Sequence, residues 1–145
     1  MSESFGDDYL LYAPHPPAST LAQWLEESNG ITRQILSNVS IADQIVPQIN
    51  ILNPPLWELG HLTWFHEFWV HRDGQESKPS FMKNADYLFN SSEMAHQDRW
   101  STPMPSLDSL LEYNHSVIEK TQDSLRTPID NQAAYFIQLA ILHQD

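Results

Sequence analysis

The sequence contains no cysteine and few basic residues. The absence of cysteine excludes disulfide bonds, thiolate metal sites and a cysteine nucleophile. Seven basic side chains stand against nineteen acidic ones, and the formal charge is −12. Nucleic acids and anionic membranes need a basic surface, so neither is expected as the main partner. The sequence also lacks an apolar run long enough to span a membrane and a basic-then-apolar secretion signal, so we expect a cytoplasmic protein.

Length and composition favour one folded domain. The chain has 145 residues, of which 41% are hydrophobic and five are tryptophans. A chain of this size buries roughly two-thirds of its unfolded surface, which is enough for a core. Strand-like alternation and internal repeats are absent, whereas four segments have helical periodicity. The sequence therefore predicts an all-α fold, an up-and-down four-helix bundle over residues 19–145, preceded by an irregular leader over residues 1–18.

Local signals place the ends of the four helices. Asp73 and Gly74 should end the second helix near Arg72, and Pro128 should break the chain after the third. The expected starts are a Ser19 or Thr20 cap, the Asn53 cap with Pro54, the Ser106 cap, and a position near Asp130. The apolar residues that give the first helix its period are Leu21, Trp24, Leu25, Ile31, Ile35 and Leu36.

A long segment, residues 73–105, separates the second and third helices. It is rich in serine, asparagine, aspartate and proline, and it is too long for a passive link in a compact bundle. We expect this segment to be ordered and packed against the bundle, because it contains several large apolar side chains. They are Phe81, Tyr87, Leu88, Phe89 and Trp100.

The second helix presents a stripe of tryptophan and phenylalanine side chains that is interrupted by histidines. The stripe residues follow one another at spacings of four, three, four and three, so they share one face directed at a core. A buried imidazole must form a hydrogen bond, bind a metal, or remain unsatisfied at a cost. This makes His61 the first candidate functional residue. The stripe consists of Trp57, His61, Trp64, Phe68 and His71.

His143 on the fourth helix is the second candidate. It follows Phe136 and Ala140 at four-then-three spacing, so it should also point at the bundle core. Helix bundles bind metals through side chains of facing helices, so His61 and His143 together could do so. Neutral imidazole suits iron, zinc, nickel or copper, and a pair needs at least a third ligand. The alternative is that each ring only forms a hydrogen bond with a buried hydroxyl or carbonyl.

His66 and His71 are not expected to form a metalloprotease-type pair. In His-Glu-x-x-His the two ligands lie one helical turn apart. His66 and His71 are five residues apart, which separates them by about 140° around an α-helix.

The fourth helix carries no stop signal at its end. Its apolar periodicity runs to the last residues without a following glycine, proline or asparagine. We therefore expect the natural chain to continue beyond residue 145.

Three segments resemble a known family. Residues 53–67 read Asn-Pro-Pro-Leu-Trp-Glu-Leu-Gly-His-Leu-Thr-Trp-Phe-His-Glu, which resembles the second-helix motif of the DinB-like domain in ergothioneine-type sulfoxide synthases. Residues 88–91, Leu-Phe-Asn-Ser, are similar to a downstream segment of that family. Residues 142–145, Leu-His-Gln-Asp, look like the start of its His-x-x-x-His-x-Glu motif. The matches keep the family's order and cover most of residues 20–145.

The resemblance implies a non-haem Fe(II) enzyme with three histidine ligands. His61 and His143 would be two of them, and the third would lie four residues after His143. A second domain, of the formylglycine-generating-enzyme type, would follow beyond residue 145. The implied reaction uses dioxygen to form a carbon–sulfur bond on hercynine, so the expected partners are small molecules: hercynine, dioxygen and a thiol or selenol donor. Zinc or nickel is the alternative metal.

One segment departs from the family pattern. Typical members carry several arginines after Leu-Phe-Asn-Ser to bind donor carboxylates, whereas residues 92–100 contain only Arg99. In this respect the chain looks closer to the related selenoneine synthases, whose selenium-sugar donor needs no carboxylate clamp. Arg99 and His96 are therefore the candidate substrate-binding residues, and the alternative for Arg99 is a surface salt bridge.

Two other functions are compatible with the same residues. One is a free-standing DinB-like, metal-dependent thiol transferase. The other is a helical module that has kept the fold and lost the metal. A homo-oligomer is compatible with the sequence in each case.

Overall fold

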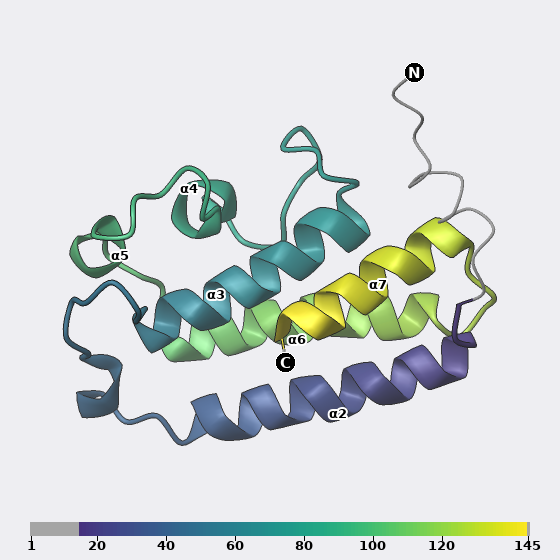
Figure 1. Ribbon diagram of the computed structural model, residues 1–145, viewed down its shortest axis with the longest axis horizontal. Helices are drawn as coiled ribbons and strands as arrows, with labels where there is room; N and C mark the ends of the chain where they lie inside the picture. The colour runs from purple at the N-terminus through teal and green to yellow at the C-terminus, as the bar shows by residue number, and fades with distance from the viewer. Residues whose placement is uncertain (1–14, 145) are drawn as a thin grey trace.

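Four long helices lie side by side in the computed structural model, which describes residues 15–144 (Figure 1). Within these residues there is no strand, so the prediction of an all-α bundle is confirmed. None of the described helices is long and apolar enough to cross a membrane. The long helices are α2 (Ala18–Ser37), α3 (Pro55–His66), α6 (Leu107–Ser124) and α7 (Asn131–Gln144). The shorter elements are η1 (Ala42–Gln44), the π-helix η2 (Glu67–His71), α4 (Ala85–Phe89) and α5 (Asp98–Ser101).

Each long helix packs on two others. α2 contacts α7 and α6, and α3 contacts the same two helices. The segment between η2 and α6 returns along the bundle, so α3 and α6 run in the same direction (Figure 1). The hydrogen-bonded pairs Asn114–Thr63 and Thr121–His66 follow this parallel order. The predicted long connection is therefore a crossing segment, and it contains α4 and α5. Because α3 and α6 are parallel, the four helices do not alternate in direction as a strictly up-and-down order requires (Figure 1).

The helix ends agree in part with the local signals. Asp73 and Gly74 take positive φ angles of 51° and 67° and end η2 as expected. Ser106 caps α6 by accepting a hydrogen bond from the Ser109 N–H at 3.2 Å. α2 starts at Ala18, without the serine or threonine cap expected from the sequence. The residue before it is Pro17, whose carbonyl accepts hydrogen bonds from the N–H groups of Thr20 and Leu21. The predicted leader falls mainly on residues 1–14, which lie outside the described residues.

The inward face of α2 is more polar than expected. Trp24, Ile31 and Ile35 are 43%, 61% and 63% exposed, so three of the apolar residues that give this helix its period lie outside the core. Two faces of this helix carry apolar residues at the same helical spacing, and this spacing alone does not tell which face is buried. The face that packs on α6 and α7 includes polar residues. Its buried members are Leu21, Leu25, Ser28, Asn29, Thr32 and Leu36.

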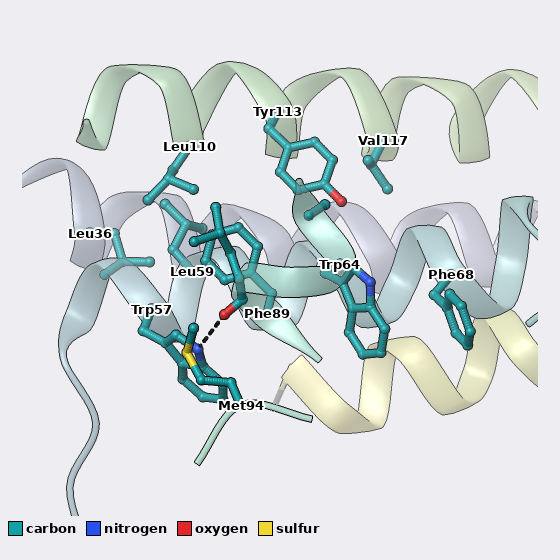
Figure 2. Close-up of a cluster of buried hydrophobic side chains, with 12 residues drawn as sticks. Leu36, Trp57, Leu59, Trp64, Phe68, Phe89, Met94, Leu110, Tyr113 and Val117 are labelled. Carbon is teal, nitrogen blue, oxygen red and sulfur yellow. Dashed lines mark hydrogen bonds between the residues drawn. The ribbon is translucent and has the colours of Figure 1, made fainter. Parts of the chain in front are cut away.

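The larger part of the core lies between α3, α4 and α6. Figure 2 shows Trp57, Phe89, Leu110 and Tyr113 gathered there, with Trp64 further along α3. Phe89 and Leu110 are completely buried. Within the crossing segment, Leu88 and Phe89 are packed as expected, whereas most of the surface of Phe81 and Tyr87 is exposed. Only the part of the segment around α4 therefore belongs to the core.

The α3 stripe uses its ring N–H groups to attach α4. Three successive stripe residues each donate one hydrogen bond to the α4 segment, whose backbone or side chain accepts it. The bonds join Trp57 Nε1 to the Leu88 carbonyl (3.0 Å), His61 Nδ1 to the Phe89 carbonyl (2.8 Å) and Trp64 Nε1 to the Asp86 carboxylate (2.8 Å).

An ion pair between a buried arginine and a partly exposed aspartate fixes the other side of α4. The side chain of Arg72 is 3% exposed, and its guanidinium donates to both carboxylate oxygens of Asp86 at 2.7 and 2.8 Å. It also donates to the carbonyls of Glu76 and Lys78. The hydrogen bonds from Arg72 lower the pKa of Asp86, so the carboxylate is ionised at neutral pH. Removing the arginine would leave this charge without its partner.

We predict that Arg72→Met lowers the free energy of unfolding by about 2 kcal/mol, because Asp86 loses the partner of its charge and the carbonyls of Glu76 and Lys78 lose a donor. Urea denaturation measures the change. Arg126→Met is the matched control, since Arg126 pairs with Asp123 on the surface and its side chain is 80% exposed; that change should cost less than about 0.5 kcal/mol. Equal losses in both variants would contradict a special role for Arg72.

Candidate metal centre

The structure brings His61 of α3 and His143 of α7 together. Their ring centroids are 5.0 Å apart and the rings are inclined by 64°. Trp57 stacks on His61 at 4.7 Å, and Phe65 stacks on His143 at 3.9 Å. Aromatic faces therefore limit the movement of both imidazoles. Phe65 was missed in the sequence, although its position four residues after His61 places it on the same side of the helix.

His61 has a defined proton position. Its Nδ1 lies 2.8 Å from the Phe89 carbonyl oxygen, which can only accept, so Nδ1 carries the proton. Burial lowers the pKa of His61, although the Phe89 carbonyl opposes this shift. The ring is therefore neutral at neutral pH and its Nε2 carries a free lone pair. Histidine ligands in metal sites commonly show this arrangement, in which a carbonyl fixes the second nitrogen.

His143 has a buried nitrogen without a partner. Its Nδ1 is shielded from solvent and has no hydrogen-bond partner among residues 15–144. Burial, followed by the proximity of His61, lowers the pKa of His143 to about 4, so this ring is also neutral at neutral pH. The hydrogen-bonding alternative accounts for one nitrogen of His61, but it leaves Nδ1 of His143 unexplained.

An open pocket of about 260 Å³ lies beside the two histidines. Its lining is polar and includes one cation and one carboxylate. A larger cavity, about 440 Å³, lies between α2 and α7, but its lining contains no histidine and is mainly apolar. The smaller pocket is therefore the candidate site. It is lined by Asn53, Trp57, Glu58, His61, Leu62, Ser91, Arg99 and His143.

Arg99 reaches this pocket from α5. Its guanidinium lies 3.8 Å from the centre of the Trp57 ring, and its Nη1 donates to the Asn53 side-chain oxygen at 2.6 Å. The buried Nε of Arg99 has no hydrogen-bond partner among the described residues, and no ion pair of this arginine occurs there. The surface salt bridge considered for Arg99 is therefore absent from the described structure.

Asn53 does not cap α3 as its sequence position suggested. Its Nδ2 donates to Glu58 at 2.5 Å, and its oxygen accepts from Arg99. No side chain caps this end of α3. Asn53 therefore connects a carboxylate and a cation at the edge of the pocket.

His96 does not line the pocket. It is half-buried, its Nε2 donates to the Leu52 carbonyl at 2.8 Å, and its ring centroid lies 4.9 Å from that of Trp100. These contacts connect the α5 region to the segment before α3. Of the two predicted substrate-binding residues, the structure brings only Arg99 next to His61.

His66 and His71 lie on the same face of the helix, so the separation of about 140° expected from α-helical geometry is wrong. The segment after His66 is a π-helix, in which residues five apart are about one turn apart. The two Nε2 atoms each lie 2.7 Å from the Thr121 hydroxyl, which in turn donates to the Val117 carbonyl. The hydroxyl therefore accepts from both rings. Each ring thus has a hydrogen-bond partner for its Nε2 atom within the core.

The π-helix also buries a carboxylate that was missed in the sequence. Glu67 is 1% exposed and accepts hydrogen bonds from the Tyr113 hydroxyl (2.7 Å), the Ser80 hydroxyl (2.5 Å) and the Phe81 N–H (2.7 Å). These bonds connect η2 to α6 and to the start of the crossing segment. The spacing of four between Glu67 and Thr63, which is also buried, was the signal available in the sequence.

Residues 15–144 contain no group of three histidine or carboxylate side chains arranged to hold a metal ion. The pair His61–His143 is therefore an incomplete donor set in the described part of the chain. A metal at this pair would need further ligands, from protein, solvent or substrate.

The His66–His71 pair predicts acid sensitivity. Burial lowers the pKa of His66 from 6.5 to about 3 and that of His71 to about 4. Between these values and 6.5 the unfolded chain binds more protons, so the free energy of unfolding falls as the pH falls through this window. His66 alone should contribute about 1 kcal/mol of this loss at about pH 5.5.

We expect His66→Gln to lose less stability than the parent between neutral pH and about pH 5.5, with a difference of about 1 kcal/mol. Urea denaturation at both pH values measures it. His115→Gln is the control, because the side chain of His115 is 67% exposed and should leave the pH dependence unchanged. If His66→Gln showed the parental pH dependence, the buried pair would not be its source.

Comparison with known proteins gives one distant relative. No protein-family model matches the chain. The chain is 25% identical over 96 residues to a curated hercynine oxygenase from Mycolicibacterium smegmatis. The match covers 66% of this chain and 22% of that protein, so the chain spans only about a fifth of the relative's length. The chain is thus distantly similar to an enzyme named for its action on hercynine, which supports the predicted resemblance at this coarse level.

Proposed function

We propose that this chain is the metal-binding helical domain of an iron(II)- and dioxygen-dependent enzyme that forms a carbon–sulfur or carbon–selenium bond on hercynine. The observation that carries the proposal is the pair of neutral imidazoles. His61 presents an unprotonated Nε2, and His143 has a buried, unpartnered nitrogen beside it. The distant similarity to a hercynine oxygenase supports the substrate class.

The residues present fit a divalent transition metal. Neutral imidazoles are suitable ligands for iron, zinc and nickel, and the choice of iron rests on the family resemblance. His61 and His143 would hold the ion, and the third histidine is expected four residues after His143. When bound, iron would supply the redox chemistry with dioxygen. The carbonyl of Phe89 and the ring of Phe65 would keep the two imidazoles in place.

Arg99 is the proposed contact for the sulfur or selenium donor. It is a cation in a strongly acidic protein, its guanidinium stacks on Trp57, and its side chain lines the pocket beside His61 and His143. One arginine can bind one carboxylate of a thiol donor, or donate charge-assisted hydrogen bonds to the hydroxyls of a selenium sugar. His96 would support this contact indirectly by tying α5 to the backbone at Leu52.

Iron content tests the ligands. In the natural full-length protein, prepared without oxygen, we expect one Fe(II) per chain, and at least about tenfold weaker binding in His61→Ala and in His143→Ala. His115→Ala should bind like the parent because its side chain is exposed on α6. Isothermal titration with Fe(II) measures the affinities.

Three results would overturn parts of this proposal. Absence of any iron-group metal from the unmutated protein would contradict the enzyme function. Parental Fe(II) affinity in His61→Ala would contradict the ligand assignment. A protein that binds zinc, transfers a thiol and consumes no oxygen when hercynine is added would favour the metal-dependent thiol transferase.

Arg99 can be tested separately from the metal. We predict that Arg99→Met raises the KM for the thiol or selenol donor about tenfold, because a charge-assisted hydrogen bond is lost. The Fe(II) affinity should not change, since the variant leaves both histidines intact. Arg126→Met, on the exposed surface, is the control. An unchanged donor KM in Arg99→Met would exclude Arg99 from donor binding.

A further inference from the structure

We infer that Gly60 and Phe89 form a positioning pair that determines which nitrogen of His61 is presented to the metal. The inference rests on the proposed function, because it concerns the same pocket. It assigns a role to two residues that do not themselves line the pocket. The link between them and the metal is the single hydrogen bond from His61 Nδ1 to the Phe89 carbonyl.

Gly60 is required by space and not by backbone conformation. A Cβ atom at this position would lie 2.1 Å from Cε1, 2.3 Å from Cζ and 2.6 Å from Cδ1 of the Phe89 ring. The ring is completely buried and lies directly against the α3 backbone. This close approach brings the carbonyl of the same residue within hydrogen-bond distance of His61. A side chain at position 60 would push the two apart.

The α4 segment has little freedom to accommodate such a push. Trp57 donates to the Leu88 carbonyl, and both Trp64 and Arg72 donate to Asp86. Along α3, the donor Trp57 precedes Gly60 and the donor Trp64 follows it, so these bonds flank the contact between Gly60 and Phe89. A displacement of Phe89 would therefore strain them as well, or it would rotate the Phe89 carbonyl away from His61.

The carbonyl decides the tautomer because it can only accept. It requires the proton on Nδ1 and leaves Nε2 free to bind a metal. Without it, a neutral imidazole can carry its proton on either nitrogen, and a protonated Nε2 cannot be a ligand. The stacking of Trp57 on His61 restricts the ring but does not select the tautomer. Gly60 and Phe89 thus act on metal affinity through His61.

The first test needs no variant. In the metal-free, ¹⁵N-labelled full-length protein, long-range ¹H–¹⁵N spectra should show His61 protonated on Nδ1 and unprotonated on Nε2 at neutral pH. His61→Ala identifies the signals. Predominance of the Nε2–H tautomer would overturn the inference.

The second test uses a matched pair of glycines. Gly60→Ala should weaken Fe(II) binding about 10- to 100-fold and remove the Nδ1–H signal of His61, as expected for loss of a group that orients a ligand. Gly30→Ala is the control, because a Cβ at Gly30 of α2 meets nothing within 4 Å. It should retain both the signal and the affinity.

A rescue variant separates positioning from loss of fold. Leucine lacks Cε1 and Cζ, the two Phe89 atoms nearest to the added methyl, so Gly60→Ala combined with Phe89→Leu should recover the Nδ1–H signal and most of the Fe(II) affinity. If folded Gly60→Ala kept both the signal and the affinity, the inference would fail while the proposed function stood. Parental Fe(II) affinity in His61→Ala would instead overturn the proposed function. If Gly60→Ala does not fold, the spectrum of the unmutated protein decides.

Discussion

The attachment of α4 to the aromatic stripe of α3 is the constraint on which the remaining structure depends. Trp57, His61 and Trp64 face the core, where each ring N–H would be costly to bury without an acceptor. The α4 segment supplies all three acceptors. The crossing segment is therefore not a passive connection between α3 and α6. It completes the hydrogen bonds of the helix that carries the candidate ligand, and the Arg72–Asp86 pair fixes it from the other side.

The candidate site combines this attachment with the packing of α7. α3 and α4 together define the orientation and tautomer of His61, and α7 brings His143 to 5.0 Å from it. Both rings lose water on burial, and the resulting decrease of their pKa values keeps them neutral and able to act as ligands. At the mouth of the pocket Arg99 adds a positive charge to a protein of net charge −12, so an anionic or strongly polar donor would be attracted locally.

The second histidine pair lies at the two ends of the π-helix: His66 precedes it and His71 is its last residue. Glu67 and His66, where the α-helix passes into this turn, point into the core and contact Tyr113 and Thr121. The π-turn also brings Nε2 of His71 within hydrogen-bond distance of the Thr121 hydroxyl, so the two rings share one partner. π-Turns occur often near functional sites, and here the turn directly follows the helix that carries His61. Within residues 15–144 the two pairs therefore differ: both Nε2 atoms of His66 and His71 contact the Thr121 hydroxyl, whereas Nδ1 of His143 has no hydrogen-bond partner.

The sequence alone determined the features that depend on neighbouring residues: four helical segments, the Ser106 cap, the stop at Asp73 and Gly74, and the inward direction of His61 and His143. Spacing along one helix is sufficient for these, because local backbone geometry repeats every turn. Only the tertiary structure decided the outward direction of Trp24 and Ile31, the π-turn after His66, and the acceptor for His61. That acceptor lies 28 residues away in the sequence and depends on a ring packed against Gly60, a contact that exists only when α4 folds back onto α3.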